Sequence, residues 1–343
     1  MKMFVEDDVD PKALADARIA VIGYGSQGRA HALNLRDSGY KVVVGLRPDG
    51  KTAARAKADG FDVRTPAEAA KGATLVAMLT PDMSHRALFE QIEKNLSTKA
   101  TLLFAHGFSI HYHRVQAAET LDVVLVAPKG PGDLVRRQYE AGQGVPCLIA
   151  VANDATGRAQ ARALAYAHAI GGTRSGVLET TFAEETETDL FGEQAVLCGG
   201  ATELVLKGYE TLVEAGYQPE VAYFECLHEL KLIVDLIYQG GLNYMRYSVS
   251  DTAEHGDYTG GPRVVTEQTR QELRKMLAEV QDGTYAKAWM AEHAAGRPWF
   301  DATRKAERSH QIEQVGAKLR DMMPFLDPVK DPLKKTEKEG VGA

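Results

Sequence analysis

Acidic residues recur four positions apart in two stretches of the second half of the chain. Asp189 and Glu193 form one pair, and Glu225 and Glu229 form the other. Residues with this spacing share one face of an α-helix, so each pair directs two carboxylates toward one point. Such carboxylates repel each other unless a cation lies between them, and oxygen ligands suit magnesium or manganese. The spacing therefore predicts a divalent-metal site.

The first pair also permits a simpler interpretation. It lies in the run 184–193, which holds five acids in ten residues. A solvated helix start would favour acids for its dipole alone. The second pair lies in the apolar run 222–233, where a buried carboxylate needs a cation or a partner. The metal interpretation therefore depends mainly on the second pair.

Two alternatives remain for the acids of the second pair. His228 and Lys231 are close enough in sequence to be their partners. The dipeptide His228-Glu229 also suggests a zinc-protease helix, but that motif needs a second histidine where Leu232 stands. Zinc chemistry of that type is excluded, whereas a salt bridge remains open.

A glycine pattern, Gly23-x-Gly25-x-x-Gly28, carries a second chemistry. It follows the β-rich run 18–22 and precedes the helical run 29–33. In this context glycines permit a tight turn and let the backbone approach a pyrophosphate, which then meets the amides at the helix N-terminus. The pattern predicts a dinucleotide-binding site.

The residues after the second predicted strand bear on the choice of dinucleotide. An NAD-specific protein would place an acid there, but this chain has Arg47. Arg47, Lys51 and Thr52 suit a 2′-phosphate, which favours NADPH. Asp49 would repel that phosphate and suit ribose hydroxyls, so NADH remains possible. A solvated turn with incidental charges is the remaining interpretation.

Composition excludes several classes of protein. The 343 residues carry a formal net charge of -7, which leaves no basic footprint for nucleic acid. The three cysteines form no Cys-x-x-Cys pair, which is typical of a reduced cytoplasm. The most apolar helical run, 230–238, is far shorter than the ~20 residues that a membrane span needs. No secretory signal is visible at the start, and we expect a cytoplasmic protein without a membrane partner.

Two regions with different periodicity must position these residues. Up to residue 180 short apolar runs alternate with helical stretches, which predicts a doubly wound, mostly parallel sheet. Strands are expected at 19–22, 42–46, 75–79, 102–104, 123–126 and 147–151. Beyond residue 181 we expect only helices, at 194–215, 219–239, 266–281 and 298–322. The predicted domains are a dinucleotide-binding domain over 1–181, a helical domain over 182–327 and a flexible tail over 328–343.

Longer stretches resemble one family over nearly the whole chain. They are Gly23 to Gly28, Ala105-His106-Gly107-Phe108, Ala127-Pro128-Lys129-Gly130-Pro131-Gly132, 184–200, 222–235 and 243–257. The chain is similar to the short-form (class I) ketol-acid reductoisomerases. This resemblance implies an N-terminal Rossmann-like doubly wound sheet and a knotted, all-α C-terminal domain. It also implies an enzyme of valine and isoleucine biosynthesis that couples an alkyl migration to a hydride transfer.

The expected substrate is 2-acetolactate or 2-aceto-2-hydroxybutyrate. The products would be 2,3-dihydroxyisovalerate or 2,3-dihydroxy-3-methylvalerate, with NADPH and two Mg²⁺ as cofactors. The resemblance further implies a homodimer, or an assembly of dimers, in which the two acidic pairs of one site come from different subunits. The excess of apolar surface expected on the helix at 222–238 independently favours packing against another subunit.

Site residues follow position by position from the resemblance. Asp189, Glu193, Glu225 and Glu229 match metal ligands, Ser250 matches a substrate contact, and His106 matches a catalytic histidine. Lys129 lies in the loop beside the site. Glu229, or a hydroxide at the metal, is expected to take the substrate proton, and His106 or Lys129 to supply one. The expected cofactor-binding residues are Gly23, Tyr24, Gly25, Ser26, Gln27, Gly28, Arg47, Gly50, Thr52, Asp82 and Gly132.

Some positions depart from the usual family pattern. Arg29 and Asp133 stand where histidine is usual, and Gly50 replaces a serine that helps to hold the 2′-phosphate. Asp251 and His255, beside Ser250, replace asparagine and tyrosine. Two rival functions remain, a metal-free hydroxyacid dehydrogenase and a noncatalytic NADP-binding sensor. The first leaves both acidic pairs unexplained, and the second predicts binding without magnesium-dependent turnover.

Overall fold

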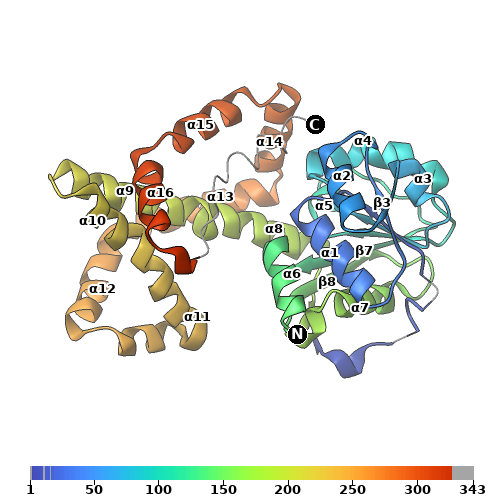
Figure 1. The fold of residues 1–343 in the computed structure, drawn as a ribbon, viewed down its shortest axis with the longest axis horizontal. Helices are drawn as coiled ribbons and strands as arrows, with labels where there is room; N and C mark the ends of the chain where they lie inside the picture. Colours follow the sequence, from blue (N-terminus) through green and yellow to red (C-terminus); the bar gives the residue numbers. More distant parts are fainter. Residues whose placement is uncertain (1, 11, 16, 327–343) are drawn as a thin grey trace. The chain divides into compact units, whose positions relative to one another are not determined.

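The computed structural model describes residues 2–10, 12–15 and 17–326 (Figure 1). The chain divides into two compact units, of which the first reaches Thr186 and the second begins at Glu187. The tail predicted over 328–343 lies outside the described residues.

The first unit is built on a nine-stranded sheet with the order β1-β9-β8-β7-β6-β5-β2-β3-β4. The run from β7 to β4 is parallel, as the alternation of apolar runs and helices predicts. The strands are β1 (Met3–Phe4), β2 (Ile19–Ile22), β3 (Val42–Gly45), β4 (Asp62–Arg64), β5 (Leu75–Met78), β6 (Thr101–Phe104), β7 (Asp122–Pro128), β8 (Cys147–Asn153) and β9 (Val177–Glu179).

Strand residues alternate between two separate cores, one on each face of the sheet. Ile19 and Val21 pack in one core with α1, α2 and α7, while Ala20 and Ile22 pack in the other with α3 and α4. This is the doubly wound arrangement that the sequence predicts. The helices of the first unit are η1 (Glu6–Asp8), α1 (Ser26–Asp37), α2 (Lys51–Ala58), α3 (Pro66–Ala70), α4 (Asp82–Ile92), η2 (Glu93–Asn95), α5 (Phe108–His111), α6 (Gly132–Glu140), α7 (Ala159–Ala169) and η3 (Gly172–Arg174).

Three strands were not expected from the sequence. β1, β4 and β9 are two or three residues long, which is too short to be predicted from an apolar run. β8 also pairs antiparallel with β7, whereas β9 runs parallel to β8. Local periodicity does not encode strand direction, so only the pairing itself reveals this reversal.

Helix α8 (Phe182–Gly192) leads from the first unit into the second, where all described elements are helical. The expected all-α character is confirmed, but the predicted helices are divided more finely. The remaining helices are η4 (Glu193–Leu197), α9 (Gly199–Glu214), α10 (Pro219–Tyr223), η5 (Phe224–His228), α11 (Glu229–Ser248), α12 (Asp251–Val264), α13 (Glu267–Gln281), α14 (Thr284–Ala294), α15 (Pro298–Arg308), α16 (Gln311–Asp321) and η6 (Pro324–Leu326).

The helices expected at 194–215 and 219–239 are interrupted in one particular way. η4 and η5 are π-helical turns, in which Cys198 N–H bonds the carbonyl of Glu193 and Glu229 N–H bonds that of Phe224. π-helical turns are rare and occur often at functional sites. One begins at Glu193 and the other contains Glu225, so both coincide with the predicted metal ligands.

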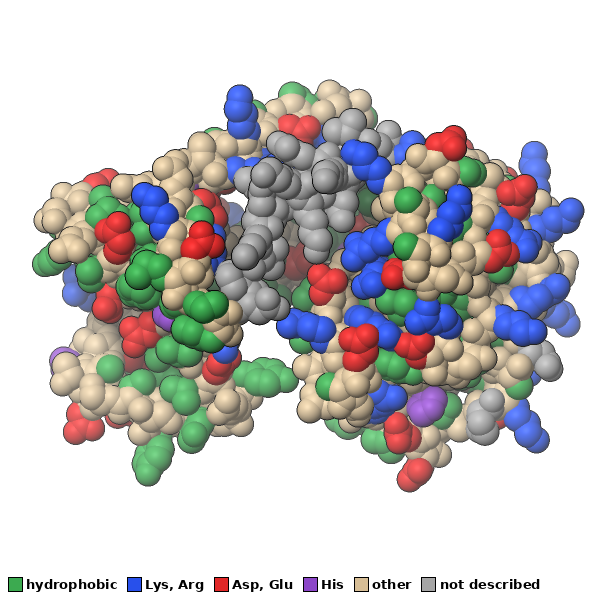
Figure 2. Space-filling model, in the orientation of Figure 1, with side chains coloured by type: hydrophobic (Ala, Val, Ile, Leu, Met, Phe, Trp, Pro, Cys, Tyr) green, Lys and Arg blue, Asp and Glu red, His purple; other side chains and the backbone are tan. Residues whose placement is uncertain are grey.

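Helix α11 carries much apolar surface. Leu230, Leu232, Val234, Tyr238 and Leu242 are all exposed on it. Figure 2 shows apolar side chains gathered at the surface of the helical unit. Among the described helices, none combines the length and the apolar character of a membrane span.

Candidate functional site

The sheet topology gathers the predicted cofactor residues at one edge. β3, β2, β5, β6 and β7 are consecutive, parallel neighbours. Their carboxyl ends therefore meet at the same edge, where ligands bind in folds of this class. The loops at that edge hold the glycine turn, the segment 47–52, Asp82, His106 and the segment 129–132.

Each glycine of the fingerprint meets a different constraint. Gly23 has a φ of +108°, and a Cβ there would lie 2.5 Å from the Leu79 carbonyl oxygen. A Cβ on Gly28 would lie 2.5 Å from the carbonyl oxygen of Gly23, so this glycine lets α1 pack closely on the turn. A Cβ on Gly25 would meet nothing within 4 Å. Open space beside a helix N-terminus suits a pyrophosphate, and the turn fits a dinucleotide.

The loop after β7 packs directly on this turn. A Cβ on Gly132 would lie 2.3 Å from the backbone of Ser26, so only glycine permits this approach. The side-chain amide of Gln27 donates to the carbonyl of Gly130 over 2.9 Å. The Oε1 atom of Gln27 is buried and has no partner among the described residues. The glycine turn and the Lys129 loop thus form one rigid surface, which leaves an acceptor available for a ligand.

The loop predicted to contact the adenosine ribose precedes α2. Arg47 and Asp49 are exposed in it, and Gly50 is the N-cap of α2. Lys51 and Thr52 form the first turn of that helix. A charged loop that ends in a helix N-terminus suits a phosphate or ribose hydroxyls.

Asp82 begins α4 beyond the end of β5, the strand next to the glycine turn. Its carboxylate lies 3.7 Å from Nδ1 of the buried His85. The two ring nitrogens of His85 lie 2.8 Å from the Ser109 hydroxyl and 2.8 Å from the Thr80 carbonyl oxygen. Burial lowers the pKa of His85, so the ring is neutral. Its contacts with Ser109 and Thr80 fix the ring beside Asp82.

Glu185 is a candidate functional residue that sequence reasoning did not single out. Its side chain is only 1% exposed, and its Oε1 atom accepts a hydrogen bond from Lys129 Nζ over 3.0 Å. Its Oε2 atom accepts from the backbone N–H of Gly107 over 2.8 Å. A buried carboxylate is stable here because it has both a cation and an amide donor. Glu185 therefore holds Lys129 against the turn that carries His106.

His106 lies next to this buried pair. One of its ring nitrogens lies within 4.8 Å of a Glu185 carboxylate oxygen. The backbone N–H of Phe108 donates to His106 Nδ1 over 3.3 Å, so a neutral ring carries its proton on Nε2. Gly107 permits this approach, because a Cβ there would lie 2.2 Å from Thr186 Oγ1. The structure thus brings together two of the predicted catalytic residues, His106 and Lys129. Glu185, which was not predicted, connects them.

The predicted metal ligands occupy two segments of the helical unit. Asp189 lies on α8, one turn after Glu185, and Glu193 opens η4. Glu225 lies in η5 and Glu229 opens α11. Among the described residues, the cluster of possible ligand atoms that includes Asp189 contains none of Glu193, Glu225 and Glu229. The assembly of the four acids from two subunits, which the resemblance implies, stays a prediction.

The second acidic pair, Glu225 and Glu229, is not buried within one chain, so the argument that buried carboxylates need a partner does not apply to it there. Glu225 and Glu229 are both exposed, although the apolar run around them suggested burial. Lys231, an alternative partner, pairs with Asp235 on α11, while the ring of His228 packs against Phe224. The apolar neighbours differ, because Ala222 and Tyr223 are buried whereas Leu230 and Leu232 on α11 are exposed. The all-carboxylate donor set still fits a hard divalent cation.

Ser250, the predicted substrate contact, is the N-cap of α12. Its hydroxyl oxygen accepts a hydrogen bond from the N–H of Ala253 over 3.2 Å. This bond fixes the exposed side chain at the start of the helix, beside Asp251. The described contacts do not connect Ser250 with the acidic pairs.

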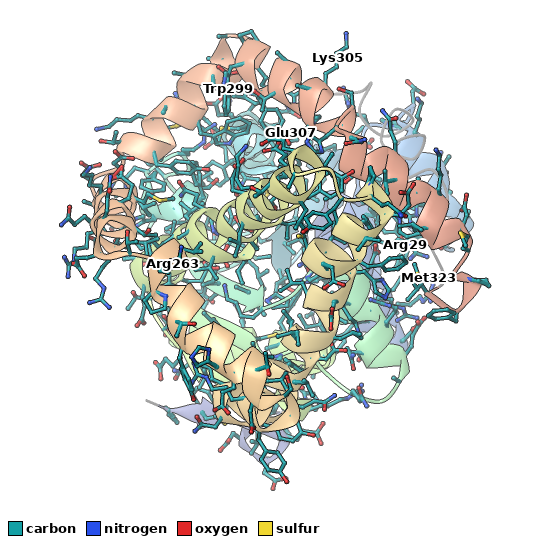
Figure 3. The ribbon with its side chains drawn as sticks, turned by 90° about the vertical axis from the view of Figure 1, so that its left-hand side faces the viewer. Arg29, Arg263, Trp299, Lys305, Glu307 and Met323 are labelled. Atoms are coloured by element: carbon teal, nitrogen blue, oxygen red, sulfur yellow. The ribbon has the colours of Figure 1, made fainter. Side chains whose placement is uncertain are left out.

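An aromatic groove of about 620 Å³ lies between α14 and α15. Tyr285, Trp289, Trp299 and Glu307 are among its lining residues, and Figure 3 labels Trp299 and Glu307. The pKa of Tyr285 is raised by burial and by the charge of Glu193. The groove residue Tyr285 thus senses the charge of a predicted metal ligand, a relation that sequence spacing did not indicate.

Comparisons with known proteins agree with these features. Residues 13–176 match the family described as acetohydroxy acid isomeroreductase, NADPH-binding domain, and residues 182–325 match ketol-acid reductoisomerase, C-terminal domain. An NADH-preferring ketol-acid reductoisomerase from an uncultured archean is 43% identical, with a TM-score of 0.92. That match covers 94% of this chain and 99% of the other.

Other solved structures share the fold alone. An NAD-binding semialdehyde dehydrogenase from Cupriavidus necator is 19% identical, with 77% and 98% of the two chains covered and a TM-score of 0.59. A pyrroline-5-carboxylate reductase from Coxiella burnetii is 14% identical, with 78% and 98% covered and a TM-score of 0.55. The two family matches and the first structure are far more specific. The chain belongs to the ketol-acid reductoisomerase family and is an oxidoreductase that uses a nicotinamide cofactor.

Proposed function

We propose that this protein converts 2-acetolactate, or 2-aceto-2-hydroxybutyrate, into the corresponding 2,3-dihydroxy acid, 2,3-dihydroxyisovalerate or 2,3-dihydroxy-3-methylvalerate. The reaction is a magnesium-dependent alkyl migration followed by reduction with NADPH, within valine and isoleucine biosynthesis. The observation that carries the proposal is the contact of Lys129 with the buried Glu185 beside His106, at the sheet edge that holds the glycine turn. A metal-free dehydrogenase or a sensor would not need the acids that follow on α8.

Different predicted cofactor-binding residues are proposed to contact different parts of the dinucleotide. Gly25 and the first turn of α1 receive the pyrophosphate, and Gln27 offers its buried Oε1 atom as an acceptor. The backbone of Gly23, Tyr24, Ser26 and Gly28 shapes that turn, and Gly132 closes the surface beside it. Arg47 and Gly50 in the loop before α2, and Thr52 in the first turn of α2, are proposed to contact the 2′-position, and Asp82 borders the neighbouring loop.

NADPH is the proposed cofactor because Arg47 and Thr52 suit a 2′-phosphate. A second candidate, NADH, is favoured by the exposed Asp49 and by Gly50, which offers no hydroxyl. The relative at 43% identity is an NADH-preferring enzyme, which supports this candidate. Both dinucleotides are therefore to be tested.

Asp189, Glu193, Glu225 and Glu229 are proposed to hold two magnesium ions. When bound, such ions act as Lewis acids on the hydroxyl and carbonyl oxygens of the substrate. The π-helical turns η4 and η5 support the assignment, because they aim acids where a regular helix would not. The exposure of Glu225 and Glu229 also leaves their carboxylates accessible to ligands from outside the chain.

The remaining groups handle protons and orientation. Glu229 takes the proton of the substrate hydroxyl, and Ser250 contacts the substrate. His106 offers a proton from Nε2, since its Nδ1 accepts the Phe108 amide. Lys129 supplies a positive charge and a proton, and Glu185 fixes its position. These roles separate the base from the acid groups.

The proposal includes a homodimer, or an assembly of dimers, with shared active sites. The exposed apolar side chains of α11 lie directly after Glu229. Covering this surface with a second copy would bury the apolar residues and surround the exposed acids at the same time. Proteins of this kind act on small molecules, and no nucleic acid or membrane partner is proposed.

The experiment is a spectroscopic measurement of NADPH oxidation by purified protein with 2-acetolactate, with magnesium and with a chelator. We expect oxidation only with magnesium, and the assay is repeated with NADH and with 2-aceto-2-hydroxybutyrate. Oxidation that persists after chelation contradicts the metal assignment. Dinucleotide binding without turnover under every condition contradicts the proposed reaction.

A further inference from the structure

The carboxylate of Asp59 joins the end of α2 to the glycine turn and to α1. Its Oδ2 atom accepts hydrogen bonds from the Tyr24 hydroxyl and from Arg29 Nε, each over 2.8 Å. Its Oδ1 atom accepts from Arg29 Nη2 over 3.2 Å, which makes the arginine contact bidentate. Tyr24 belongs to the fingerprint and Arg29, which Figure 3 labels, to the first turns of α1.

Further contacts fix the backbone around Asp59. Arg36, two turns after Arg29 on α1, donates from Nη1 to the Asp59 carbonyl oxygen over 2.7 Å. The Arg36 guanidinium lies 5.3 Å from the Phe61 ring centroid, and that ring packs edge-on against Tyr24 at 5.8 Å. Two arginines on one face of α1 therefore hold the side chain and the main chain of the residue that ends α2.

The charges agree with this geometry. The hydrogen bond from Arg29 is the main cause that lowers the pKa of Asp59. Burial, followed by the bond to Asp59, raises the pKa of Tyr24, so the hydroxyl stays a donor at all ordinary pH values. Tyr24 is 2% exposed and belongs to the core on one face of the sheet, so its side chain acts from within the fold.

The position of this network matters because α2 is short. Lys51 begins the helix, Ala58 ends it, and the loop that faces the 2′-position precedes it directly. Fixing the far end of a helix of eight residues fixes the near end too. The glycine turn is proposed to bind the pyrophosphate on the 5′-side of the adenosine ribose and the 2′-loop the 2′-position of the same ribose, so the distance between turn and loop affects the affinity for the dinucleotide.

We infer that Asp59 is a positioning residue for the dinucleotide, which acts through Tyr24 and Arg29 to set the spacing between the glycine turn and the loop before α2. It touches no part of the cofactor itself. The inference rests on the proposed binding of the pyrophosphate at Gly25. Asp59 itself lies at the end of α2 away from the 2′-loop, so weaker binding is expected with both NADPH and NADH.

The test compares dissociation constants for NADPH and NADH, measured by the fluorescence of the bound nicotinamide. Asp59→Asn and Tyr24→Phe are each expected to raise both constants about tenfold, which corresponds to ~1.4 kcal/mol. In turnover the loss appears in KM for the dinucleotide rather than in kcat. The matched control is Asp62→Asn, because Asp62 also pairs with an arginine, Arg64, but does not touch the fingerprint.

The outcomes separate this inference from the proposed function. Constants that stay at the wild-type value in both variants, even with a lower melting temperature, would show that the network is merely structural. If Asp59→Asn does not fold, Tyr24→Phe decides, because it leaves the Arg29 pair intact. Gly25→Val places a side chain in open space. Unchanged binding by that variant overturns both ideas, whereas lost binding there with normal Asp59 and Tyr24 variants overturns only the positioning role.

Discussion

Lys129 Nζ lies 3.0 Å from Glu185 Oε1, although the first residue directly follows β7 and the second belongs to α8. The pair is asymmetric, because the Glu185 side chain is 1% exposed and the Lys129 side chain is 33% exposed. A buried acid thus orients a partly exposed lysine. This arrangement suits a group that must meet a substrate in one fixed position.

Replacement of Glu185 tests that role. Glu185→Gln keeps the shape but removes the charge that holds Lys129, so kcat is expected to fall by about 10²-fold. Binding of NADPH should change little. The matched control is Glu184→Gln, because Glu184 is its exposed neighbour and accepts a hydrogen bond from Thr180. Steady-state kinetics check both variants, and a Glu185 variant as active as the Glu184 variant would contradict the role.

Replacement of Glu225 tests the metal assignment. Glu225→Gln removes one anionic ligand, so turnover with magnesium should fall by at least about 10²-fold while NADPH affinity stays close to wild type. The binding of Mn²⁺, followed by electron paramagnetic resonance, should weaken in parallel. Glu220→Gln, on the neighbouring α10, is the control. Normal metal binding by the Glu225 variant would exclude it as a ligand.

Charge in the loop before α2 is expected to tune the choice of cofactor. Asp49→Asn removes a negative charge that would repel a 2′-phosphate, so the ratio of kcat/KM for NADPH to that for NADH should rise by about tenfold. Asp62→Asn, which removes a carboxylate from the nearby β4, should leave the ratio unchanged. A ratio that does not move in the Asp49 variant would place the 2′-position elsewhere.

The apolar surface of α11 is expected to be the contact with a second copy. Val234→Asp puts a charge into that surface and should shift the protein toward monomers and lower its activity, if the sites are shared. Light scattering after size-exclusion chromatography measures the mass. Val5→Asp is the matched control, because Val5 is 47% exposed and Val234 is 49% exposed. An unchanged mass in the Val234 variant would locate the interface on another surface.

Acid should destabilise the first unit through its buried histidines. Burial lowers the pKa of His31 from 6.5 to about 3, and burial also lowers that of His85. The unfolded chain therefore binds a proton that the folded chain cannot, and stability is lost as the pH falls below 6.5 toward 3. Each histidine contributes up to ~1.4 kcal/mol per pH unit.

Urea unfolding between pH 7 and pH 5 measures this loss. His31→Gln should reduce the slope of the free energy of unfolding against pH, whereas replacement of the exposed His113 should leave that slope unchanged. An equal slope in wild type and the His31 variant would contradict the assignment.

The sequence alone determined those features that depend on neighbours along the chain. The strand β2 (Ile19–Ile22) and the glycine turn were predicted correctly, because a four-residue apolar run and three spaced glycines are local signals, whereas α1 begins at Ser26 rather than at residue 29. The parallel core of the sheet and the all-helical second half also followed from periodicity. The family followed because long segments carry specific patterns, and the family matches confirm it.

Only the tertiary structure decided which residues of the same type, in one stretch of sequence, are buried and which partners they contact. Five acids between 184 and 193 look alike in the sequence, yet only Glu185 is buried against Lys129 and Gly107. The sequence likewise does not indicate the partners of Asp59, because Tyr24 and Arg29 are 35 and 30 positions away in the chain. The π-helical turns and the reversed β8 escaped prediction as well. Burial, strand direction and ion-pair choice depend on segments distant in sequence, which only the folded chain brings into contact.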